Sequence, residues 1–201
     1  MTKINGLPDS APDTLIAIEK ADIAVAEAAA AITHDPMIAA LGEASEVADQ
    51  PPLIGITLVV LVAGLALRRQ RMATAGARML AAHLIATGIK TAVKRSVDRT
   101  RPHVLTEEDR YEVREARSTH PRYNSFPSGH TAGAVAVAEG LARTVPQATW
   151  PVRLWAASIA AIQIPRRKHY VSDVAAGAMV GIVADRAVRL VERIGRHWLR
   201  R

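Results

Sequence analysis

The feature that most constrains the fold is an uncharged run of fifteen residues, Leu53 to Leu67. Counted from the preceding acid, eighteen residues separate Asp49 from Arg68 without a charged side chain. A helix needs roughly twenty apolar residues to cross about 30 Å of hydrocarbon, and fewer in a thin bilayer. The sequence Arg68-Arg69-Gln70-Arg71 follows at once and is typical of a cytoplasmic anchor. This run is the strongest candidate for a membrane-spanning helix.

The composition narrows the possible partners. The chain has 201 residues, enough for one domain, and a formal net charge of +7. A basic chain can bind nucleic acid, an anionic membrane surface or anionic substrates. Aromatic residues make up only 3% and no recognised nucleic-acid-binding motif is present, so we expect no nucleic acid partner. The absence of cysteine excludes disulfides and thiolate metal sites.

Apolar periodicity predicts a series of helices. The first, over 13–32, carries Glu19, Lys20, Asp22 and Glu27, which makes a membrane span improbable. We expect an amphipathic helix that packs on the protein or lies at the membrane interface, with an ordinary soluble helix as the alternative. Further helices are expected over 37–47, 53–67, 72–93, 132–145, 152–164 and 174–194.

The remaining segments read as connections. Residues 94–124 predict a polar, charge-dense loop, and the chain shows no convincing strand. Residues 1–12 predict a loose tail without a cleavable signal peptide, and 195–201 predict a basic tail. In the last helix, Gly177 and Gly181 form a G-x-x-x-G pair suited to close helix contact.

These patterns predict an all-α fold, a multi-pass transmembrane helical bundle with an N-terminal amphipathic helix. We expect about five spanning helices, with 1–50 forming the tail and amphipathic helices and 51–201 the membrane-embedded domain. If the Arg-rich sequence at 68–71 and the C-terminal tail are cytoplasmic, the helix count puts 94–128 and 166–173 together on the opposite face. The uncharged runs are short, so a soluble helical bundle is the alternative.

The sequence Pro127-Ser128-Gly129-His130 stands directly before a helical run. A helix start exposes unpaired N–H groups and the positive end of the helix dipole, which favours anions. Gly129 lets the backbone approach a ligand closely, Ser128 adds a hydroxyl, and His130 can carry a proton near neutral pH. The alternative is a capped helix with an exposed histidine.

Two further spacings accompany it. Lys94 is followed after six residues by Arg101-Pro102, and these cations could neutralise phosphate oxygens or simply snorkel at a membrane boundary. His169 is followed after three residues by Asp173, a spacing that puts a carboxylate beside the imidazole if a helix begins there. Asp173 could instead be an N-cap, or serve both roles.

Taken in this order, the three motifs resemble those of the type 2 phosphatidic acid phosphatase superfamily, over Lys94 to about Gly181. The resemblance implies that His169 attacks phosphorus, that Asp173 orients it, and that His130 protonates the leaving group. It also implies that Lys94, Arg101, Ser128 and Gly129 bind the phosphate, without a metal or other cofactor. The chain departs from the family where a Ser-Arg pair should stand, because it has Ile162-Gln163. Gln163 can hydrogen-bond without charge, and Arg166, Arg167 or Lys168 could supply the missing cation.

We therefore expect a metal-independent phosphatase that hydrolyses a lipid-linked phosphate or diphosphate through a phosphohistidine. Its partners would be the lipid phosphate substrate and membrane lipids. Its expected location is the membrane, a bacterial inner membrane by preference, with the active site on the non-cytoplasmic face. The alternatives are a non-catalytic membrane protein that binds an anionic headgroup, and a soluble acid phosphatase of the same superfamily.

Overall fold

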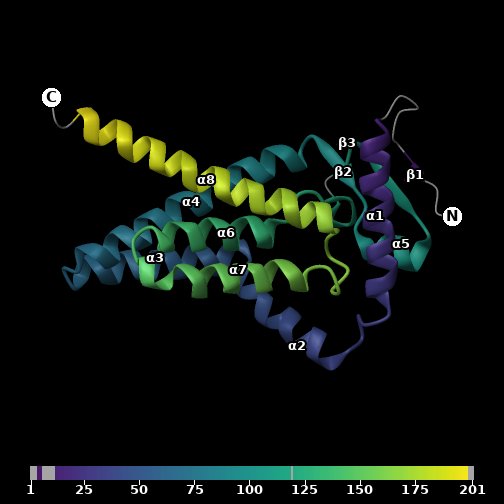
Figure 1. Ribbon diagram of the computed structural model, residues 1–201, viewed down its shortest axis with the longest axis horizontal. Helices are drawn as coiled ribbons and strands as arrows, with labels where there is room; N and C mark the ends of the chain where they lie inside the picture. The colour runs from purple at the N-terminus through teal and green to yellow at the C-terminus, as the bar shows by residue number, and fades with distance from the viewer. Residues whose placement is uncertain (1–3, 6–11, 119, 199–201) are drawn as a thin grey trace.

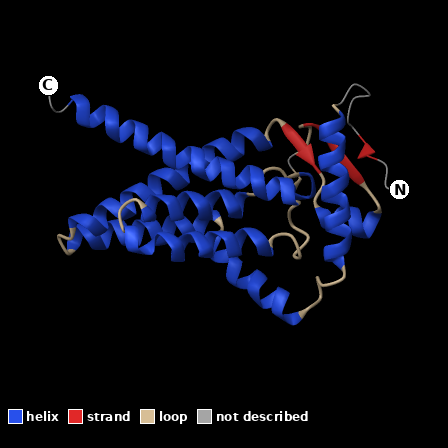
Figure 2. Cartoon of the chain, in the orientation of Figure 1, coloured by secondary structure: helices blue, strands red, loops and turns tan. Residues whose placement is uncertain are grey.

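The computed structural model describes residues 4–5, 12–118 and 120–198, and these are mostly helical (Figure 2). The described residues form eight α-helices: α1 (Asp13–Ala30), α2 (Pro36–Ser45), α3 (Gln50–Ala66), α4 (Gln70–Lys94), α5 (Pro102–Glu108), α6 (Gly129–Ala142), α7 (Thr149–Ile162) and α8 (Val171–Trp198). Each helix predicted from periodicity is present, with ends shifted by a few residues. The basic tail begins inside α8, and its residues 199–201 lie outside the described part of the chain.

Helices α3, α4, α6, α7 and α8 run alongside one another as an elongated bundle (Figure 1). Helix α6 lies at its centre and contacts α4, α7 and α8. It can do so because it is built from small residues, and alanines such as Ala134 and Ala136 have no exposed surface. Small side chains let neighbouring backbones approach closely, which is how helices pack where lipid surrounds them.

The predicted G-x-x-x-G contact is confirmed between α8 and α6. A Cβ atom placed on Gly177 would lie 2.6 Å from the carbonyl oxygen of Ser128. One placed on Gly181 would lie 2.8 Å from the carbonyl oxygen of Ala132. Both glycines are therefore required by the close approach of the two backbones, and Gly177 ties the start of α8 to the start of α6.

The predictions that 94–124 is a loop and that the chain has no strand were wrong. This segment holds α5 and two strands, β2 (Val97–Arg99) and β3 (Tyr111–Glu115), which pair antiparallel. Strand β1 (Ile4–Asn5) pairs parallel to β3, which gives the order β1-β3-β2. Residues 4–5 of the expected loose tail are thus in a sheet, while 1–3 and 6–11 lie outside the described residues. The strands are too short and too charged for an alternating pattern to show.

Helix α1 crosses the end of the bundle beside the sheet and α5 (Figure 1). It buries Ile23 and Ala26, as periodicity predicts, but also the charged side chains Glu19 and Asp22. Its predicted place at a membrane interface stays a prediction.

Among the described residues, no helix taken alone combines the length and apolar character of a membrane span. One pair of helical segments, Pro36–Ala48 and Gln50–Ala66, meets that criterion together and is bent by 55° at the break between them. The run at 53–67 that the sequence singles out lies almost wholly in the second of these segments, α3.

Candidate active site

The sequence-predicted site residues gather at one end of the bundle. The last turn of α4, the first turns of α6 and α8, and the loop before α8 all lie at the end that faces α1 (Figure 1). Residues separated by about eighty positions in the chain are thereby brought into one region.

Ser128 links two of the predicted motifs. It is fully buried as the N-cap of α6, and its Oγ accepts hydrogen bonds from the backbone N–H (3.4 Å) and Oγ1 (3.0 Å) of Thr131. Its own backbone N–H donates to the carbonyl oxygen of Asp173 at 3.0 Å. The Pro-Ser-Gly-His turn and the His-x3-Asp segment are therefore joined directly, and the capped-helix interpretation of Ser128 holds alongside any role in binding.

Gly129 opens α6 and faces a lysine that sequence reasoning missed. A Cβ atom at Gly129 would lie 3.1 Å from Nζ of Lys90. Lys90 precedes Lys94 by four residues on α4, so both ammonium groups lie on one helix face. That spacing was visible in the sequence. Together with the positive end of α6, Lys90 makes the region around Gly129 strongly favourable to an anion.

Lys94 and Arg101 are both partly buried and held by backbone carbonyls. Lys94 Nζ donates to the carbonyl oxygen of Asn124, and Arg101 Nε donates to that of Pro121 at 3.0 Å. Burial lowers the pKa of Arg101, because the charged guanidinium loses hydration. In the described part of the chain neither side chain makes a further hydrogen bond or ion pair, so most of their N–H groups remain available to a ligand. Beside Lys94 lies a cavity of about 450 Å³.

His169 and Asp173 lie side by side, as their spacing predicts. Nδ1 of His169 is 3.6 Å from Oδ2 of Asp173, and both side chains are buried. The same Oδ2 accepts hydrogen bonds from the backbone N–H of Tyr170 at 2.9 Å and from the hydroxyl of Ser125 at 2.5 Å. The bond to Tyr170 is the one an acid makes in the third position of a helix, so Asp173 also caps α8.

Burial disfavours the imidazolium form and lowers the pKa of His169 to about 4, although the Asp173 carboxylate acts in the opposite direction. The positive charges of Arg101 and Lys94 add to the lowering, which places both cations within electrostatic range of His169. His169 is consequently neutral near pH 7, the form that carries a free ring nitrogen.

A second cluster surrounds Gln163, the position at which the sequence departs from the family pattern. Gln163 is fully buried, and its amide Nε2 donates to the hydroxyl of Ser45 at 3.2 Å. Arg166 Nη1 donates to the same hydroxyl at 2.7 Å, so Gln163 and Arg166 meet at one atom. Arg167 instead donates to Thr106 of α5 at 2.8 Å. Of the two arginines proposed for the missing cation, Arg166 is the one that lies beside Gln163.

Glu46, which the sequence did not single out, connects this cluster to His130. Its carboxylate lies 2.6 Å from Arg166, 2.8 Å from Lys168 and 3.3 Å from Nε2 of His130. Burial alone would oppose its charge, but the hydrogen bonds from Lys168 and Arg166 lower the pKa of Glu46 to about 2. His130 is thus oriented by a carboxylate that is itself held by two cations. Within the described residues, no group of three or more His, Asp and Glu side chains could hold a metal ion.

Comparisons with known proteins bear on the fold and on the family. The chain is similar in fold to Aquifex aeolicus LpxE, with a TM-score of 0.61 at 20% identity, over 81% of this chain and 91% of that one. It is also similar to a transmembrane PAP2 type phosphatidylglycerolphosphate phosphatase from Bacillus subtilis, with a TM-score of 0.61 at 19% identity, over 88% and 87% of the two chains. No significant match was found among curated proteins. The model of the PAP2 superfamily matches residues 75–194, more than half of the chain and all of its motif residues, so this protein belongs to the PAP2 superfamily.

Proposed function

We propose that this protein is a metal-independent phosphatase that hydrolyses a lipid-linked phosphate or diphosphate through a phosphohistidine intermediate. The observation that carries the proposal is the buried, neutral His169 beside Asp173, joined through Ser128 to the positive end of α6. A buried nucleophile, an orienting carboxylate and an anion-binding helix terminus are the parts that phosphoryl transfer needs.

In this mechanism the neutral imidazole of His169 attacks phosphorus in line with the leaving oxygen. Asp173 faces Nδ1, so it favours the tautomer with the proton on that nitrogen and leaves Nε2 free to attack. As the N–P bond forms, positive charge develops on the ring, and the carboxylate stabilises it. Water then hydrolyses the phosphohistidine and releases phosphate.

The charge on the phosphoryl oxygens would be stabilised by Lys94, Arg101 and the N-terminus of α6, with Lys90 as an additional cation. His130, in the first turn of α6, would donate the proton that the leaving oxygen takes up. Arg166 would supply the cation that Gln163 lacks.

A lipid substrate is supported by the surroundings of the site. Large apolar side chains are exposed along the bundle, on α3, α7 and α8, and the site lies at one end of it. A bundle inserted in a bilayer would hold its end at the level of the lipid headgroups. We propose an integral membrane location with the site on the non-cytoplasmic face, opposite the Arg-rich connection between α3 and α4. Isoprenoid diphosphates, phosphatidate and phosphatidylglycerol phosphate all fit this chemistry.

The test is phosphate release by the purified protein in detergent from a panel of these three lipid classes. We expect hydrolysis of at least one class, inhibition by vanadate, and no loss of rate in EDTA, because side-chain cations neutralise the phosphate. His169→Ala should abolish turnover and leave no covalent phosphate on the protein. His130→Ala should slow poor leaving groups more than good ones, because a weakly basic leaving oxygen needs less help from an acid.

Two results would contradict the proposal. Activity that disappears in EDTA and returns with added metal would show a different mechanism. Binding of the lipid phosphates without any hydrolysis would favour the non-catalytic protein that binds an anionic headgroup.

A further inference from the structure

Arg99, which the mechanism above does not use, is the centre of a buried charge cluster. Its side chain is only 2% exposed, yet it contacts three carboxylates. Nη1 donates to Oδ1 of Asp173 at 2.6 Å, and Nη2 donates to Oε2 of Glu19 at 2.6 Å and to Oδ2 of Asp22 at 2.7 Å. Burial opposes the charge of Arg99, but the three carboxylates outweigh it and raise its pKa.

The remaining contacts fix the plane of this guanidinium. Nε donates to the hydroxyl of Tyr111 at 2.9 Å, and Nη1 also donates to the hydroxyl of Ser172 at 2.8 Å. The ring of Tyr170 stacks against it, with 4.2 Å between Cζ and the ring centroid. A guanidinium is a planar fork of five N–H donors, and here every edge of the fork is engaged.

Two of the three acids come from α1, which precedes the residues that the family model matches. Glu19 and Asp22 are three positions apart, so both side chains lie on one face of the helix. They are 7% and 4% exposed. Asp22 also receives hydrogen bonds from the backbone N–H and the hydroxyl of Ser172, at the start of α8. The helix is therefore docked by charge onto the turn that carries Asp173.

The two carboxylate oxygens of Asp173 have different partners. Oδ1 receives Arg99, and Oδ2 faces His169. Rotation of the carboxylate away from the imidazole would break the bond to Arg99, and Arg99 cannot follow because Glu19 and Asp22 hold its other edge. A buried ion pair that loses one partner leaves an uncompensated charge, which makes this arrangement stiff.

We propose that Arg99, together with Glu19 and Asp22 of α1, is a set of positioning residues that holds Asp173 against His169. Helix α1 then supports the reaction centre through Glu19 and Asp22. The inference rests on the proposed phosphohistidine mechanism, and it goes beyond it by assigning a function to a segment outside the matched residues. All three side chains are buried, and they act through Asp173.

The experiment compares the isosteric variants Asp22→Asn and Glu19→Gln with Asp13→Asn, which makes the same change at an exposed acid of the same helix. Arg99→Lys keeps the charge without the fork, and Arg99→Met removes both. We expect Asp22→Asn and Arg99→Lys to lower kcat on the order of a hundredfold with little change in KM, since a small misplacement of a catalytic group has that effect. Asp13→Asn should behave as the unmodified protein, and Arg99→Lys should retain more activity than Arg99→Met.

A second measurement does not depend on turnover. The ¹⁵N chemical shifts of the His169 ring report its tautomer, which the Asp173 carboxylate fixes. We expect a single Nδ1-protonated tautomer in the unmodified protein and a mixture of tautomers in Asp22→Asn and Arg99→Lys. Variants with lowered melting temperature but unchanged kcat and ring shifts would overturn the inference and leave a stabilising role only. If the unmodified protein has a fixed tautomer but hydrolyses no lipid phosphate, the proposed function is overturned. Loss of that tautomer in the variants would still support the positioning role in that case.

Discussion

At the scale of single residues, the ionisation state of His169 decides when the site can act in the proposed mechanism. A nucleophilic histidine must be neutral, and an exposed histidine loses its proton only near pH 6.5. Burial lowers the pKa of His169 to about 4, so its free base persists far into the acid range. The same shift has a cost in stability. An unfolded chain takes up this proton near pH 6.5 and the folded chain only near 4. His169 therefore leaves the free energy of unfolding unchanged above pH 6.5, lowers it progressively as pH falls from 6.5 to 4, and has its full destabilising effect below 4.

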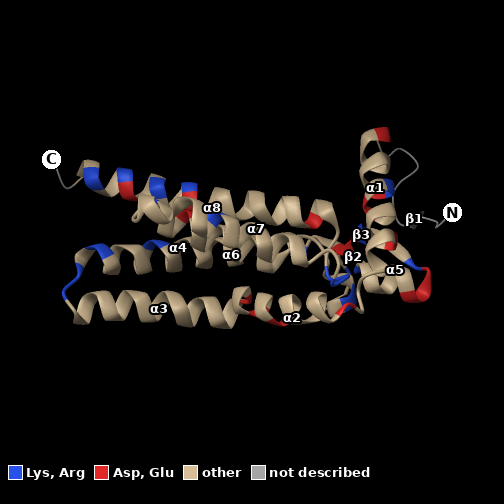
Figure 3. Cartoon of the chain, turned by 60° about the horizontal axis from the view of Figure 1, so that its bottom comes forward, with Lys and Arg blue, Asp and Glu red and all other residues tan. Residues whose placement is uncertain are grey.

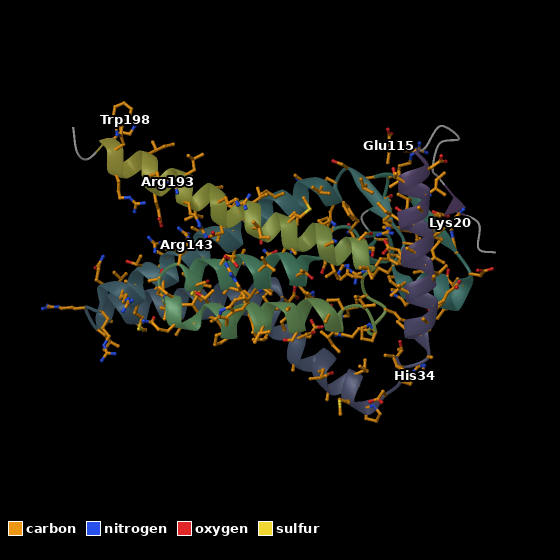
Figure 4. All side chains as sticks on the ribbon, in the orientation of Figure 1. Lys20, His34, Glu115, Arg143, Arg193 and Trp198 are labelled. Carbon is orange, nitrogen blue, oxygen red and sulfur yellow. The ribbon has the colours of Figure 1, made fainter. Side chains whose placement is uncertain are left out.

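We therefore expect the acid limb of kcat/KM, corrected for ionisation of the substrate, to fall near pH 4 rather than 6.5. The measurement is a pH profile in detergent at constant ionic strength. His34→Gln is the matched control, because His34 is exposed on the connection between α1 and α2 (Figure 4) and should leave the profile unchanged. An acid limb at pH 6.5 in the unmodified protein would contradict the proposed nucleophile.

The position of Gln163 allows a second prediction at this scale. Arg166 shares the hydroxyl of Ser45 with Gln163, whereas Arg167 is bound to α5. We expect Arg166→Ala to cost roughly 2–4 kcal/mol of transition-state stabilisation, a factor of order thirty to a thousand in rate. Arg167→Ala should cost much less, and Gln163→Arg should bring no gain because a cation already occupies the region. Kinetics of the three single variants decide the question: a faster Gln163→Arg with a silent Arg166→Ala would mean that the charge is simply missing.

At the scale of elements, the contact between α6 and α8 sets the geometry of the site. A methyl group on Gly177 would meet the carbonyl oxygen of Ser128 at 2.6 Å, and backbone cannot yield as a side chain can. We expect Gly177→Ala to destabilise the protein by about 1–3 kcal/mol, even though alanine favours a helix by about 1 kcal/mol over glycine. The displaced Ser128 should lower kcat as well.

Gly88→Ala is the control for this prediction. Gly88 is also in a helix, α4, but a Cβ there has no neighbour within 4 Å. It should raise the melting temperature in detergent slightly, through helix propensity alone. Equal melting temperatures for the two variants would show that α6 and α8 can separate without cost.

Elements differed in how far the sequence could predict them. The bundle helices were predictable because runs such as Leu53–Leu67 repeat apolar residues over many turns. The sheet was not predictable, because β2 has only three residues and two of them, Asp98 and Arg99, are charged. The role proposed for Arg99 depends on its contacts with Glu19 and Asp22, about eighty positions away. A charge in the middle of an apolar face normally indicates exposure, and only the folded chain shows that these two acids are buried against a cation. The spacing of His169 and Asp173 was local, so it could be read directly.

At the scale of the whole molecule, charge is separated from apolar surface. Lys, Arg, Asp and Glu concentrate at the two ends of the bundle, and the length of α3 carries none (Figure 3). Between the ends, apolar side chains such as Val59 and Leu154, each 67% exposed, face outward. Arg143, labelled in Figure 4, lies toward the end opposite α1 and forms an ion pair with Asp185 at 2.7 Å. Apolar surface of this extent is expected to be covered by lipid or by another protein.

The last prediction tests whether lipid covers the apolar surface, and on which side of the membrane the site lies. We expect the protein to stay with membranes through carbonate and high-salt washing and to need detergent for release. The chain has no cysteine, so single-cysteine variants report topology without a background. In right-side-out vesicles a membrane-impermeant maleimide should label Lys20→Cys, on α1. It should reach Gln70→Cys, at the start of α4 next to the Arg-rich connection, only after the membrane is opened. Recovery in the soluble fraction would contradict the membrane location, and the reverse labelling would place the site on the cytoplasmic face.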